Sequence, residues 1–451
     1  MKAPAVYNNS SHALPADFEL SEEFLAVFDR IERTQTHLFL TGEAGTGKTT
    51  FLKYFRQNTK KKHIVLAPTG IAAINIGGQT IHSFFSFPPK LIRTENIRIL
   101  KRHQKLFAAL ELVIIDEASM MRADLLDSLD QSLRLNKRNP HTPFGGVQMV
   151  LIGDMHQLPP VISKELTDHY PKLYDTRYFF SARAFRAARF EHFYLTKIYR
   201  QKDRAFTLLL NKIRMNEMTD GDLKELNSRV NTSCENFEDC ITLTPTNAQA
   251  NAINEGRLNK LGSPVFEYEA AVQGEFDPQS YPNDFKLQLK AGAQVLMIKN
   301  DAEKRWVNGS IGEVVELRQD LVKVRIGKDV HEVKPAGWEK VKYTFDEGQN
   351  NIKEEVTGRY EQYPMKLAWA ITIHKSQGLT FDRLIIDMGR GAFESGQTYV
   401  ALSRCRDFRR LYLKKPISFR DIRLDKKIKQ FKDSPSNEPF LEELTLSYEE
   451  I

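Results

Sequence analysis

The sequence is poor in cysteine and contains no long apolar run. Its 451 residues include three cysteines, Cys234, Cys240 and Cys405, which lack the close paired spacing of a zinc site. We therefore expect a reducing compartment. The opening MKAPAVYNNSSHALPAD has no apolar core for a signal peptide, and no later run approaches the ~18 apolar residues of a membrane span. These absences predict a cytoplasmic protein, nucleoid-associated if prokaryotic, that does not enter a membrane.

Chain length and charge limit the number of domains and the kind of partner. At ~100–200 residues per domain, a chain of 451 residues predicts two to four domains. The hydrophobic fraction of 41 % is enough to fold them, and 65 Lys and Arg against 58 Asp and Glu give a net charge of +7. This balance leans toward a polyanionic partner, although a soluble protein with a slightly basic surface fits equally well.

The stretch THLFLTGEAGTGKTTFLKYF reads as a strand, a glycine-rich turn and a helix. It contains the phosphate-loop pattern G-x-x-x-x-G-K-[ST], in which backbone N–H groups converge on phosphates at a helix N-terminus. Lys48 can neutralise the outer phosphates, and the Thr49 hydroxyl can ligate Mg²⁺. The flanking strand and helix disfavour a chance glycine-rich turn. The predicted nucleotide-binding residues here are Gly45, Thr46, Gly47, Lys48, Thr49 and Thr50.

Polar side chains follow two later apolar runs. LELVIIDEASM ends in Asp116 and Glu117, and VQMVLIGD leads into MHQLPPV, which contains Gln157. Such runs are typical of buried parallel strands, whose carboxyl ends share one edge of a sheet. Asp116 then suits a Mg²⁺ ligand, Glu117 can orient and deprotonate the attacking water, and Gln157 can sense the γ-phosphate. A solvated acidic loop is the alternative, but together the three stretches favour a hydrolysing ATPase over a nucleotide switch.

Two segments of the first half recur in the second half. IVLAPTGIAAIN (64–75) and TIHSFF (80–85) are followed, in the same order, by ITLTPTNAQANAIN (241–254) and TIHKSQG (372–378). Each copy reads as a strand, a Pro-Thr turn and a helix, with a later Thr-Ile-His. The shared order predicts two related α/β lobes, of which only the first has a phosphate loop.

A tandem of one active and one degenerate lobe forms a cleft in which the second lobe can present cations to the nucleotide. Two arginines suit this role: Arg200 in LTKIYRQ and Arg404 in YVALSRCR. An arginine finger can contribute about 10³ to 10⁵ in rate. In isolation, either arginine would be interpreted as a surface residue, so the prediction depends on the surrounding motifs.

These segments resemble superfamily 1 DNA helicases of the 5′-to-3′ branch, and within it the PIF (petite integration frequency) family, which is related to RecD-like helicases. The similarity covers most of the chain in order. RADLLDSLDQSL and the following PFGGVQMVLIGD look like the family's own signature. The motifs that carry it are GEAGTGKTT, APTGIAA, TIHSFF, DEASMM, GDMHQLPPV, IYRQ, TPTN, AITIHKSQGLTFD and YVALSRCR.

The resemblance implies ATP and Mg²⁺ as cofactors, and single-stranded DNA with forked or tailed duplex DNA as partners, bound by a monomer or transient dimer. Where the family often has a glutamine for adenine, this chain has Phe24, which leaves adenine selectivity open. The implied catalytic residues are Lys48, Glu117, Gln157, Arg200 and Arg404, with Gln377 and Gly378 also binding nucleotide and Thr49 and Asp116 binding the metal. The implied DNA-binding residues are Thr69, His82, Thr246, His374 and Lys375.

The predicted class is α/β: two tandem RecA-like P-loop NTPase lobes, with parallel sheets flanked by helices, and a small inserted β-barrel. The barrel follows from alternating apolar and polar residues with glycine turns, and the resemblance makes it SH3-like.

We hypothesise that the aromatic stretch FFSFPPKLIR is a wedge that helps to split duplex DNA, with core aromatics as the alternative. The expected parts are lobe 1 at 1–185 (wedge at 80–100), lobe 2 at 186–300 and 365–432, the SH3-like domain at 301–364, and an acidic tail at 433–451.

The implied function is ATP-dependent 5′-to-3′ translocation on single-stranded DNA with duplex unwinding, in replication, repair, recombination or telomere-type maintenance. G-quadruplexes and RNA–DNA hybrids are further substrates that backbone contacts do not exclude. The alternatives are a RecD-like motor subunit of a recombination complex, and a P-loop ATPase switch that does not translocate.

Overall fold

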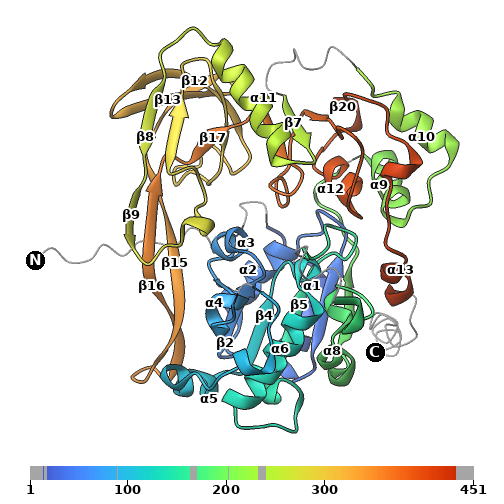
Figure 1. The fold of residues 1–451 in the computed structure, drawn as a ribbon, viewed down its shortest axis with the longest axis vertical. Helices are drawn as coiled ribbons and strands as arrows, with labels where there is room; N and C mark the ends of the chain where they lie inside the picture. Colours follow the sequence, from blue (N-terminus) through green and yellow to red (C-terminus); the bar gives the residue numbers. More distant parts are fainter. Residues whose placement is uncertain are drawn as a thin grey trace, which may run out of the picture.

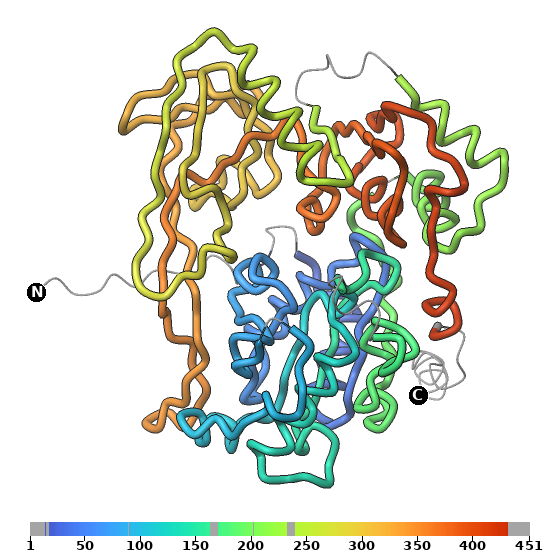
Figure 2. The backbone as a smooth tube through the Cα atoms, in the orientation of Figure 1, coloured from blue at the N-terminus to red at the C-terminus, as the bar shows by residue number. Residues whose placement is uncertain are grey.

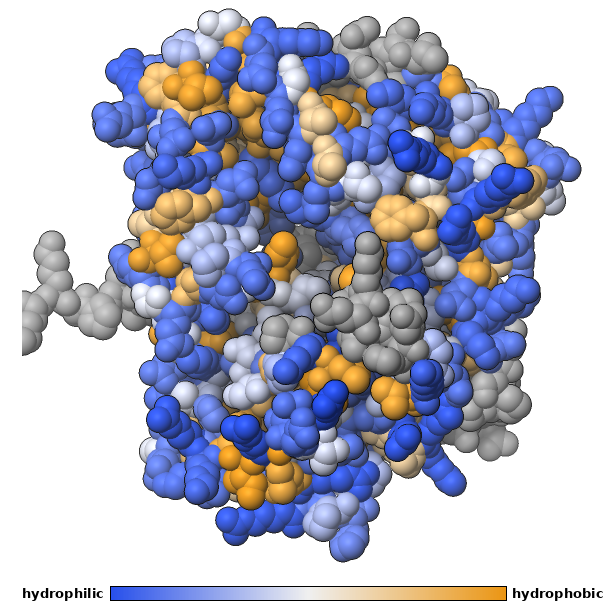
Figure 3. Space-filling view, in the orientation of Figure 1, coloured by the Kyte–Doolittle hydropathy of each residue, from blue (hydrophilic) through white to orange (hydrophobic). Residues whose placement is uncertain are grey.

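The structure is a computed structural model, and part of the chain lies outside what it describes. The predicted acidic tail and Cys234 fall outside, while Cys240 and Cys405 are buried. In the described part, no helix combines the length and apolar character needed to cross a bilayer. The face seen in Figure 3 is mainly hydrophilic, with apolar side chains in separate small groups. The described residues are 14, 18–88, 90–162, 170–201, 203–231 and 240–432.

The first lobe is built on a six-stranded sheet in the order β3-β2-β4-β5-β1-β6, and every neighbouring pair is parallel. This order places β5 between β1 and β4, so the loops after all three strands leave the same edge. The strands are β1 (Leu38–Gly42), β2 (His63–Ala67), β3 (Gln79–Thr80), β4 (Leu112–Ile115), β5 (Gln148–Ile152) and β6 (Glu191–Leu195).

Helices cover both faces of this sheet (Figure 1). Strands β4 and β5 are buried at every position, as their apolar sequences predict. Strand β6 extends the same sheet, so the predicted lobe boundary at residue 185 is wrong. The helices are α1 (Glu22–Arg33), α2 (Lys48–Asn58), α3 (Gly70–Asn75), α4 (Ile81–Phe85), α5 (Gln104–Ala109), α6 (Ala123–Asn136) and α8 (Arg183–Ala188).

The second lobe has a smaller, four-stranded parallel sheet in the order β18-β7-β19-β20. Together the two sheets confirm the predicted α/β class with tandem RecA-like lobes. The strands are β7 (Ile241–Thr244), β18 (Ala370–Thr372), β19 (Leu384–Ile386) and β20 (Leu411–Leu413). The helices are α9 (Arg204–Met215), α10 (Asp220–Asn227), α11 (Asn247–Lys260), α12 (Gln397–Leu402) and α13 (Lys426–Lys432).

The sequence repeat corresponds to a repeated local geometry. Thr69 caps α3 at φ −122° and ψ 154°, and Thr246 caps α11 at φ −126° and ψ 150°. Each hydroxyl accepts a hydrogen bond from the backbone N–H three residues on, as N-cap residues do. Thr80 and Thr372, which open the two Thr-Ile-His segments, make the equivalent contact at 3.1 and 3.2 Å. The two lobes therefore share strand, cap and turn at equivalent places.

An antiparallel β unit is inserted into the second lobe, as predicted, and has its own core around Tyr268, Val295 and Trp306. The predicted bounds 301–364 are too narrow, because the insertion runs from β8 to β17. Its five-stranded sheet, in the order β14-β13-β12-β11-β17, contains β11 (Gln294–Met297), β12 (Ile311–Arg318), β13 (Leu321–Ile326), β14 (Asp329–Val333) and β17 (Met365–Leu367). The remaining strands are β8 (Phe266–Glu269), β9 (Ala271–Gly274), β10 (Lys286–Leu289), β15 (Ala336–Asp346) and β16 (Asn351–Gln362).

Strands β15 and β16 form a long hairpin, the arm, which leaves the β unit and runs beside the first lobe (Figures 1 and 2). The buried Tyr343 hydroxyl accepts a hydrogen bond from the Val65 N–H at 3.0 Å and donates to the Val65 carbonyl at 3.1 Å. Strand β3 pairs with Leu66 and Ala67 of β2. The Tyr343 hydroxyl bonds to Val65, the residue just before them in the same strand, and so continues the contacts on that side of β2. Ion pairs of Arg56 with Glu354 and of Lys105 with Glu347 add to the contact.

The end of the described chain crosses back to the first lobe. Helix α13 packs beside α8 (Figure 1), and Ile428 is buried in the first-lobe core. The Phe431 ring stacks on Phe180 with centroids 4.3 Å apart and contacts His192 at 5.2 Å. The second lobe is therefore connected to the first both by the linker after β6 and by this C-terminal helix.

The wedge hypothesis for residues 80–100 is not supported by its aromatic side chains. Phe84, Phe85 and Phe87 are all buried in the first-lobe core, where the rings of Phe85 and Phe87 stack at 5.3 Å. Helix α4, which starts at the Thr80 cap, turns these rings inward. The alternative interpretation, core aromatics, is the one that the structure confirms.

Replacing Tyr343 with Phe should loosen the arm, because the ring is kept while both hydrogen bonds to Val65 are lost. We expect the free energy of unfolding to fall by about 1–3 kcal/mol, the usual cost of leaving buried polar groups unsatisfied. Amide hydrogen exchange at Val65 should become faster. Tyr54→Phe is the control, since that ring packs between Phe18 and Phe28. Unchanged exchange at Val65 in Tyr343→Phe would contradict the role of this contact.

Candidate active site

The phosphate loop joins β1 to α2, which begins at Lys48 with Gly47 as its N-cap. Gly45 and Gly47 have φ values of 92° and 84°, a region that residues with a Cβ atom rarely adopt. A Cβ on Gly45 would also lie 2.5 Å from the Cβ of Arg200, and one on Gly47 3.1 Å from the Phe24 ring. Glycine is thus required at both positions, and the loop lies directly against Arg200.

The Lys48 amine rests on the loop itself. It donates hydrogen bonds to the carbonyl oxygens of Gly42 and Glu43, both at 2.8 Å. Burial lowers the pKa of Lys48, whereas the carboxylates of Asp154 and Glu117 act to raise it. The Lys48 ammonium is therefore influenced by two carboxylates, Glu117 after β4 and Asp154 after β5.

The three predicted threonines of the loop differ in environment. Thr46 is buried and its hydroxyl donates to the Glu43 carbonyl at 2.9 Å, so this side chain shapes the loop. Thr49 is exposed and Thr50 is half-buried in the first turn of α2. That turn is the positive end of the helix dipole, where anions bind favourably. Thr49 and Thr50 are thus positioned where a ligand could contact them, whereas Thr46 stabilises the conformation of the loop.

Asp116 and Glu117 follow β4, at the predicted edge of the sheet. Glu117 has φ 52° and ψ 41°, a left-handed conformation that is uncommon outside glycine and often occurs at functional sites. Its N–H donates to the Asp116 carboxylate at 2.9 Å. Burial and then the Glu117 charge raise the pKa of Asp116 to about 7. Burial likewise raises the pKa of Glu117, although Lys48 and Arg404 oppose the shift.

Gln157 lies near the start of the loop that follows β5 and contacts the second lobe. The Gln377 side-chain amide donates a hydrogen bond to Oε1 of the Gln157 side chain at 3.5 Å. The side-chain Nε2 of Gln157 donates to the Asp154 carboxylate at 3.4 Å. Both contacts are at the long end of the hydrogen-bond range. Gly378, with φ 79°, follows Gln377 in the same turn. The structure thus brings predicted residues of both lobes together.

Arg404 is buried in the cleft, and Arg200 is half-buried there. Burial, and next the nearby Arg404, lower the pKa of Arg200 to about 9. Burial lowers the pKa of Arg404 to about 10 against the opposing charge of Glu117. Arg404 donates to the carbonyl of Val400 and the hydroxyl of Ser403, and Arg200 to the carbonyl of Ser403. Two guanidiniums that hydrogen-bond to neutral oxygens form a site that favours an anion.

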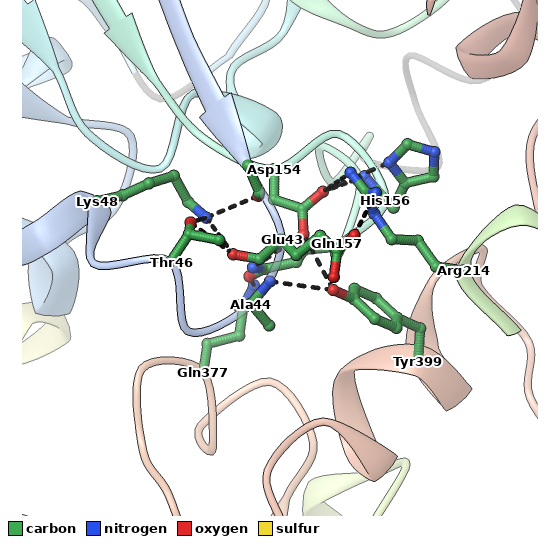
Figure 4. A network of polar contacts seen from close by, with 11 residues as sticks. Glu43, Ala44, Thr46, Lys48, Asp154, His156, Gln157, Arg214, Gln377 and Tyr399 are labelled. Carbon is green, nitrogen blue, oxygen red and sulfur yellow. Dashed lines mark hydrogen bonds and ion pairs between the residues drawn. The ribbon is translucent and has the colours of Figure 1, made fainter. Parts of the chain in front are cut away.

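Further residues that the sequence predictions missed belong to this network, among them Asp154, Tyr399 and Arg214 (Figure 4). Asp154 follows β5 just as Asp116 follows β4, which is a signal that sequence reasoning could have used. The Tyr399 hydroxyl accepts from the Ala44 N–H at 3.0 Å and lies 3.5 Å from Asp154. Arg214 contacts Glu43 and Asp154 at 3.6 and 3.5 Å. The amphipathic pattern of α9 gives no hint that Arg214 is buried there.

Two of the five predicted DNA-binding side chains are exposed. Thr246 and Lys375 lie at the surface, while Thr69, His82 and His374 are half-buried. Burial lowers the pKa of both histidines, so both are neutral near pH 7 and can donate or accept one hydrogen bond per ring nitrogen. Neutral hydroxyl and imidazole groups suit phosphate and sugar contacts that do not depend on base sequence.

The predicted metal ligands fit a cation that arrives with its nucleotide. Within the described ranges, no group of three or more His, Cys, Asp or Glu could hold a metal ion unaided. Asp116 and the Thr49 hydroxyl are oxygen donors, and Mg²⁺ is usually bound by one or two such groups together with substrate phosphates. The pKa of Asp116 is raised by burial and by the Glu117 charge, while Lys48 opposes the shift. When bound, Mg²⁺ would neutralise phosphate charge.

Phe24, the departure from the family pattern, faces the core. It is buried in a cluster with Phe51, the two ring centroids lying 5.4 Å apart. Its N–H donates to the Ser21 hydroxyl that caps α1. Its side chain therefore packs beside Gly47 and offers no hydrogen bond to a base.

The chain is similar to known proteins both in sequence and in structure. The sequence model of the PIF1-like helicases matches residues 19–222. Over 413 residues the chain is 32 % identical to the ATP-dependent DNA helicase Pif1 of Bdellovibrio bacteriovorus, covering 88 % of both chains. It is 34 % identical to the human ATP-dependent DNA helicase PIF1 over 87 % of this chain, but spans 60 % of that protein's length.

Among solved structures, the fold is similar to Pif1 from Bacteroides sp at 37 % identity. The unliganded structure gives a TM-score of 0.85, covering 94 % of this chain and 98 % of that chain. The ADP-AlF4 complex gives 0.86, and the complex with single-stranded DNA gives 0.67, each covering 92 % of this chain and 97 % of the other. On sequence and structure alike, the chain belongs to the PIF1-like helicase family.

Proposed function

We propose that the chain is an ATP-driven helicase that moves 5′ to 3′ along single-stranded DNA and unwinds the duplex ahead of it. One observation carries the proposal. The turn after β18 presents exposed Lys375 on one side, while Gln377, two residues later, contacts Gln157 beside the phosphate loop. A single second-lobe turn can therefore respond to DNA and to nucleotide. The 5′-to-3′ polarity is taken from the family resemblance.

In this proposal, ATP binds with Mg²⁺ between the lobes. The phosphate-loop amides and Lys48 hold the phosphates, and Thr49 and Asp116 hold the metal. Glu117 orients and deprotonates the attacking water, and Arg200 and Arg404 stabilise the charge on the transferring phosphoryl group. The family's nucleotide chemistry and the positions of these side chains around one cleft support the assignment.

The two lobes would grip DNA through equivalent caps. Thr69 and His82 belong to the first lobe, and Thr246, His374 and Lys375 to the second. Because the caps have the same geometry, the two lobes would present two similar DNA-binding surfaces. Closure of the lobes would change the distance between these surfaces, as movement along the repeating DNA backbone requires. The chain is proposed to act as a monomer or transient dimer. Because such contacts do not exclude ribose, RNA–DNA hybrids and G-quadruplexes remain candidate substrates within the same proposal.

The β unit is proposed to change position when DNA binds. The chain is equally identical to the unliganded and DNA-bound Bacteroides proteins, yet it superposes less well on the latter. The arm contacts the first lobe through the Tyr343 hydrogen bonds, ion pairs and apolar side chains. In this proposal, the free energy of DNA binding offsets the loss of these contacts.

Glu117→Gln should reduce DNA-stimulated ATP hydrolysis by about 10²- to 10⁴-fold, the contribution usual for a general base, while nucleotide binding is retained. Lys48→Ala should instead weaken nucleotide binding itself. Glu111→Gln is the matched control, because it removes a carboxylate from the opposite end of β4, where Glu111 accepts the Lys62 N–H at 2.7 Å. A folded Glu117→Gln protein with normal ATP turnover would refute the assigned role.

Strand displacement tests motion and polarity together. We expect duplexes with a 5′ single-stranded tail to be unwound with ATP, and 3′-tailed duplexes to remain intact. DNA-stimulated ATP turnover without unwinding would indicate a motor subunit that needs a larger complex. ATP turnover that ignores DNA would indicate a switch without translocation.

Gln377→Ala should uncouple the two ligands, because it removes the contact with Gln157 and leaves Lys375 in place. We expect DNA stimulation of ATP hydrolysis to fall about tenfold, within the usual range of coupling energies. Gln349→Ala, at the exposed end of the arm, is the control. If Gln377→Ala kept normal DNA and ATP affinities together with full DNA stimulation, the coupling role would have to be withdrawn.

A further inference from the structure

Arg214 projects from α9 into the base of the phosphate loop. The rest of the buried face of α9, including Phe206, Leu210 and Ile213, packs in the second-lobe core. Arg214 itself is only 5 % exposed and lies over the Tyr194 ring at 5.7 Å. Figure 4 shows its guanidinium on the side of the loop that faces away from Gln377. A second-lobe cation is thus buried among first-lobe groups.

The guanidinium contacts two carboxylates that belong to different parts of the first lobe. One nitrogen lies 3.6 Å from Glu43, in the phosphate loop, and another lies 3.5 Å from Asp154, after β5. Burial raises the pKa of Glu43, and Arg214 is the strongest opposing influence. Burial also opposes ionisation of Asp154, yet Arg214, His156 and then Lys48 hold its pKa far below the usual range. Arg214 is therefore the strongest of the groups that favour the ionised form of both acids.

The same two residues also act on Lys48. The backbone carbonyl of Glu43 is one of the two oxygens that accept hydrogen bonds from the Lys48 amine, and the Asp154 carboxylate is the acid that most strongly raises the pKa of Lys48. Without Arg214, Asp154 would keep hydrogen bonds from the His156 N–H, Gln157 and Tyr399, but it would lose its guanidinium partner, and Lys48 is the next lysine or arginine that acts on it. Because a buried charge is costly unless it is paired, the Lys48 ammonium would be drawn toward Asp154 and away from the phosphates it should bind.

We propose that Arg214 is an interlobe positioning residue for ATP hydrolysis. By neutralising Asp154 and holding Glu43 from the second lobe, it keeps Lys48 available for nucleotide phosphates. It also ties the position of α9 to the shape of the phosphate loop. The inference rests on the proposed ATP-driven function, since it concerns how that nucleotide site is held.

The test compares Arg214→Met, Arg214→Lys and the double variant Arg214→Met with Asp154→Asn. We expect Arg214→Met to raise the KM for ATP about tenfold, as expected for residues in one charge network, with a smaller change in kcat. Arg214→Lys keeps the charge but cannot span both carboxylates, so KM should rise about threefold. In the double variant, neutralising Asp154 should return KM toward the wild-type value.

Arg204→Met is the matched control, because it removes an exposed arginine from the same helix; its KM for ATP should match the wild type. Melting temperature and nucleotide-free binding to single-stranded DNA report whether each variant is folded. A folded Arg214→Met protein with wild-type KM, or a double variant no better than the single one, overturns the proposal. A wild-type KM for Arg214→Lys also overturns it, whether or not Arg214→Met folds.

Basal and DNA-stimulated rates of ATP hydrolysis test the helicase function and the role of Arg214 separately. If the wild-type protein hydrolyses ATP without stimulation by DNA, the proposed helicase function fails. The KM ratios between the Arg214 variants and the wild type can still be measured in the basal reaction, and they decide the role of Arg214 independently.

Discussion

The cleft depends on an ion-pair network that crosses from one lobe to the other. Glu43 and Asp154 belong to the first lobe, whereas Arg214 belongs to a helix of the second-lobe core. Charges removed from water are tolerated when they are paired and hydrogen-bonded. These ion pairs therefore join the two lobes at the base of the phosphate loop. A nucleotide enters a site whose polar groups are already oriented, which is the condition for electrostatic preorganisation.

The other two arginines of the cleft have different partners. Arg200 and Arg404 hydrogen-bond to carbonyl and hydroxyl oxygens, and the charge of Glu117 acts on Arg404. Arg214 is paired with two carboxylates, whereas the hydrogen-bond partners of Arg200 and Arg404 are neutral. The charges of Arg200 and Arg404 therefore favour an added anion, as the proposed nucleotide site requires.

Local patterns predicted the parts of the site that are contiguous in sequence. The glycines and Lys48 specify a loop that opens a helix, apolar runs place Asp116 and Glu117 at a strand end, and the Thr caps repeat because their sequences repeat. Contacts made by tertiary packing were not predictable in this way. Strand β6 could belong to either lobe until its partner β1 was known, and the phenylalanines of α4 resembled a projection because their proline-interrupted run conceals an inward-facing turn. The arm had the pattern of a hairpin, but no pattern indicated its docking on β2.

The contacts around Asp154 form one continuous path across the molecule. Gln377, in the same turn as Lys375, contacts Gln157, which contacts Asp154. Asp154 in turn contacts Tyr399 and Arg214, which return to the phosphate loop at Ala44 and Glu43. In the proposed mechanism, a shift of the second-lobe turn on DNA would reach the start of the phosphate loop, at Glu43 and Ala44, through this path. Coupling through such a path needs only small movements, because packed polar networks adopt discrete arrangements rather than continuous ones.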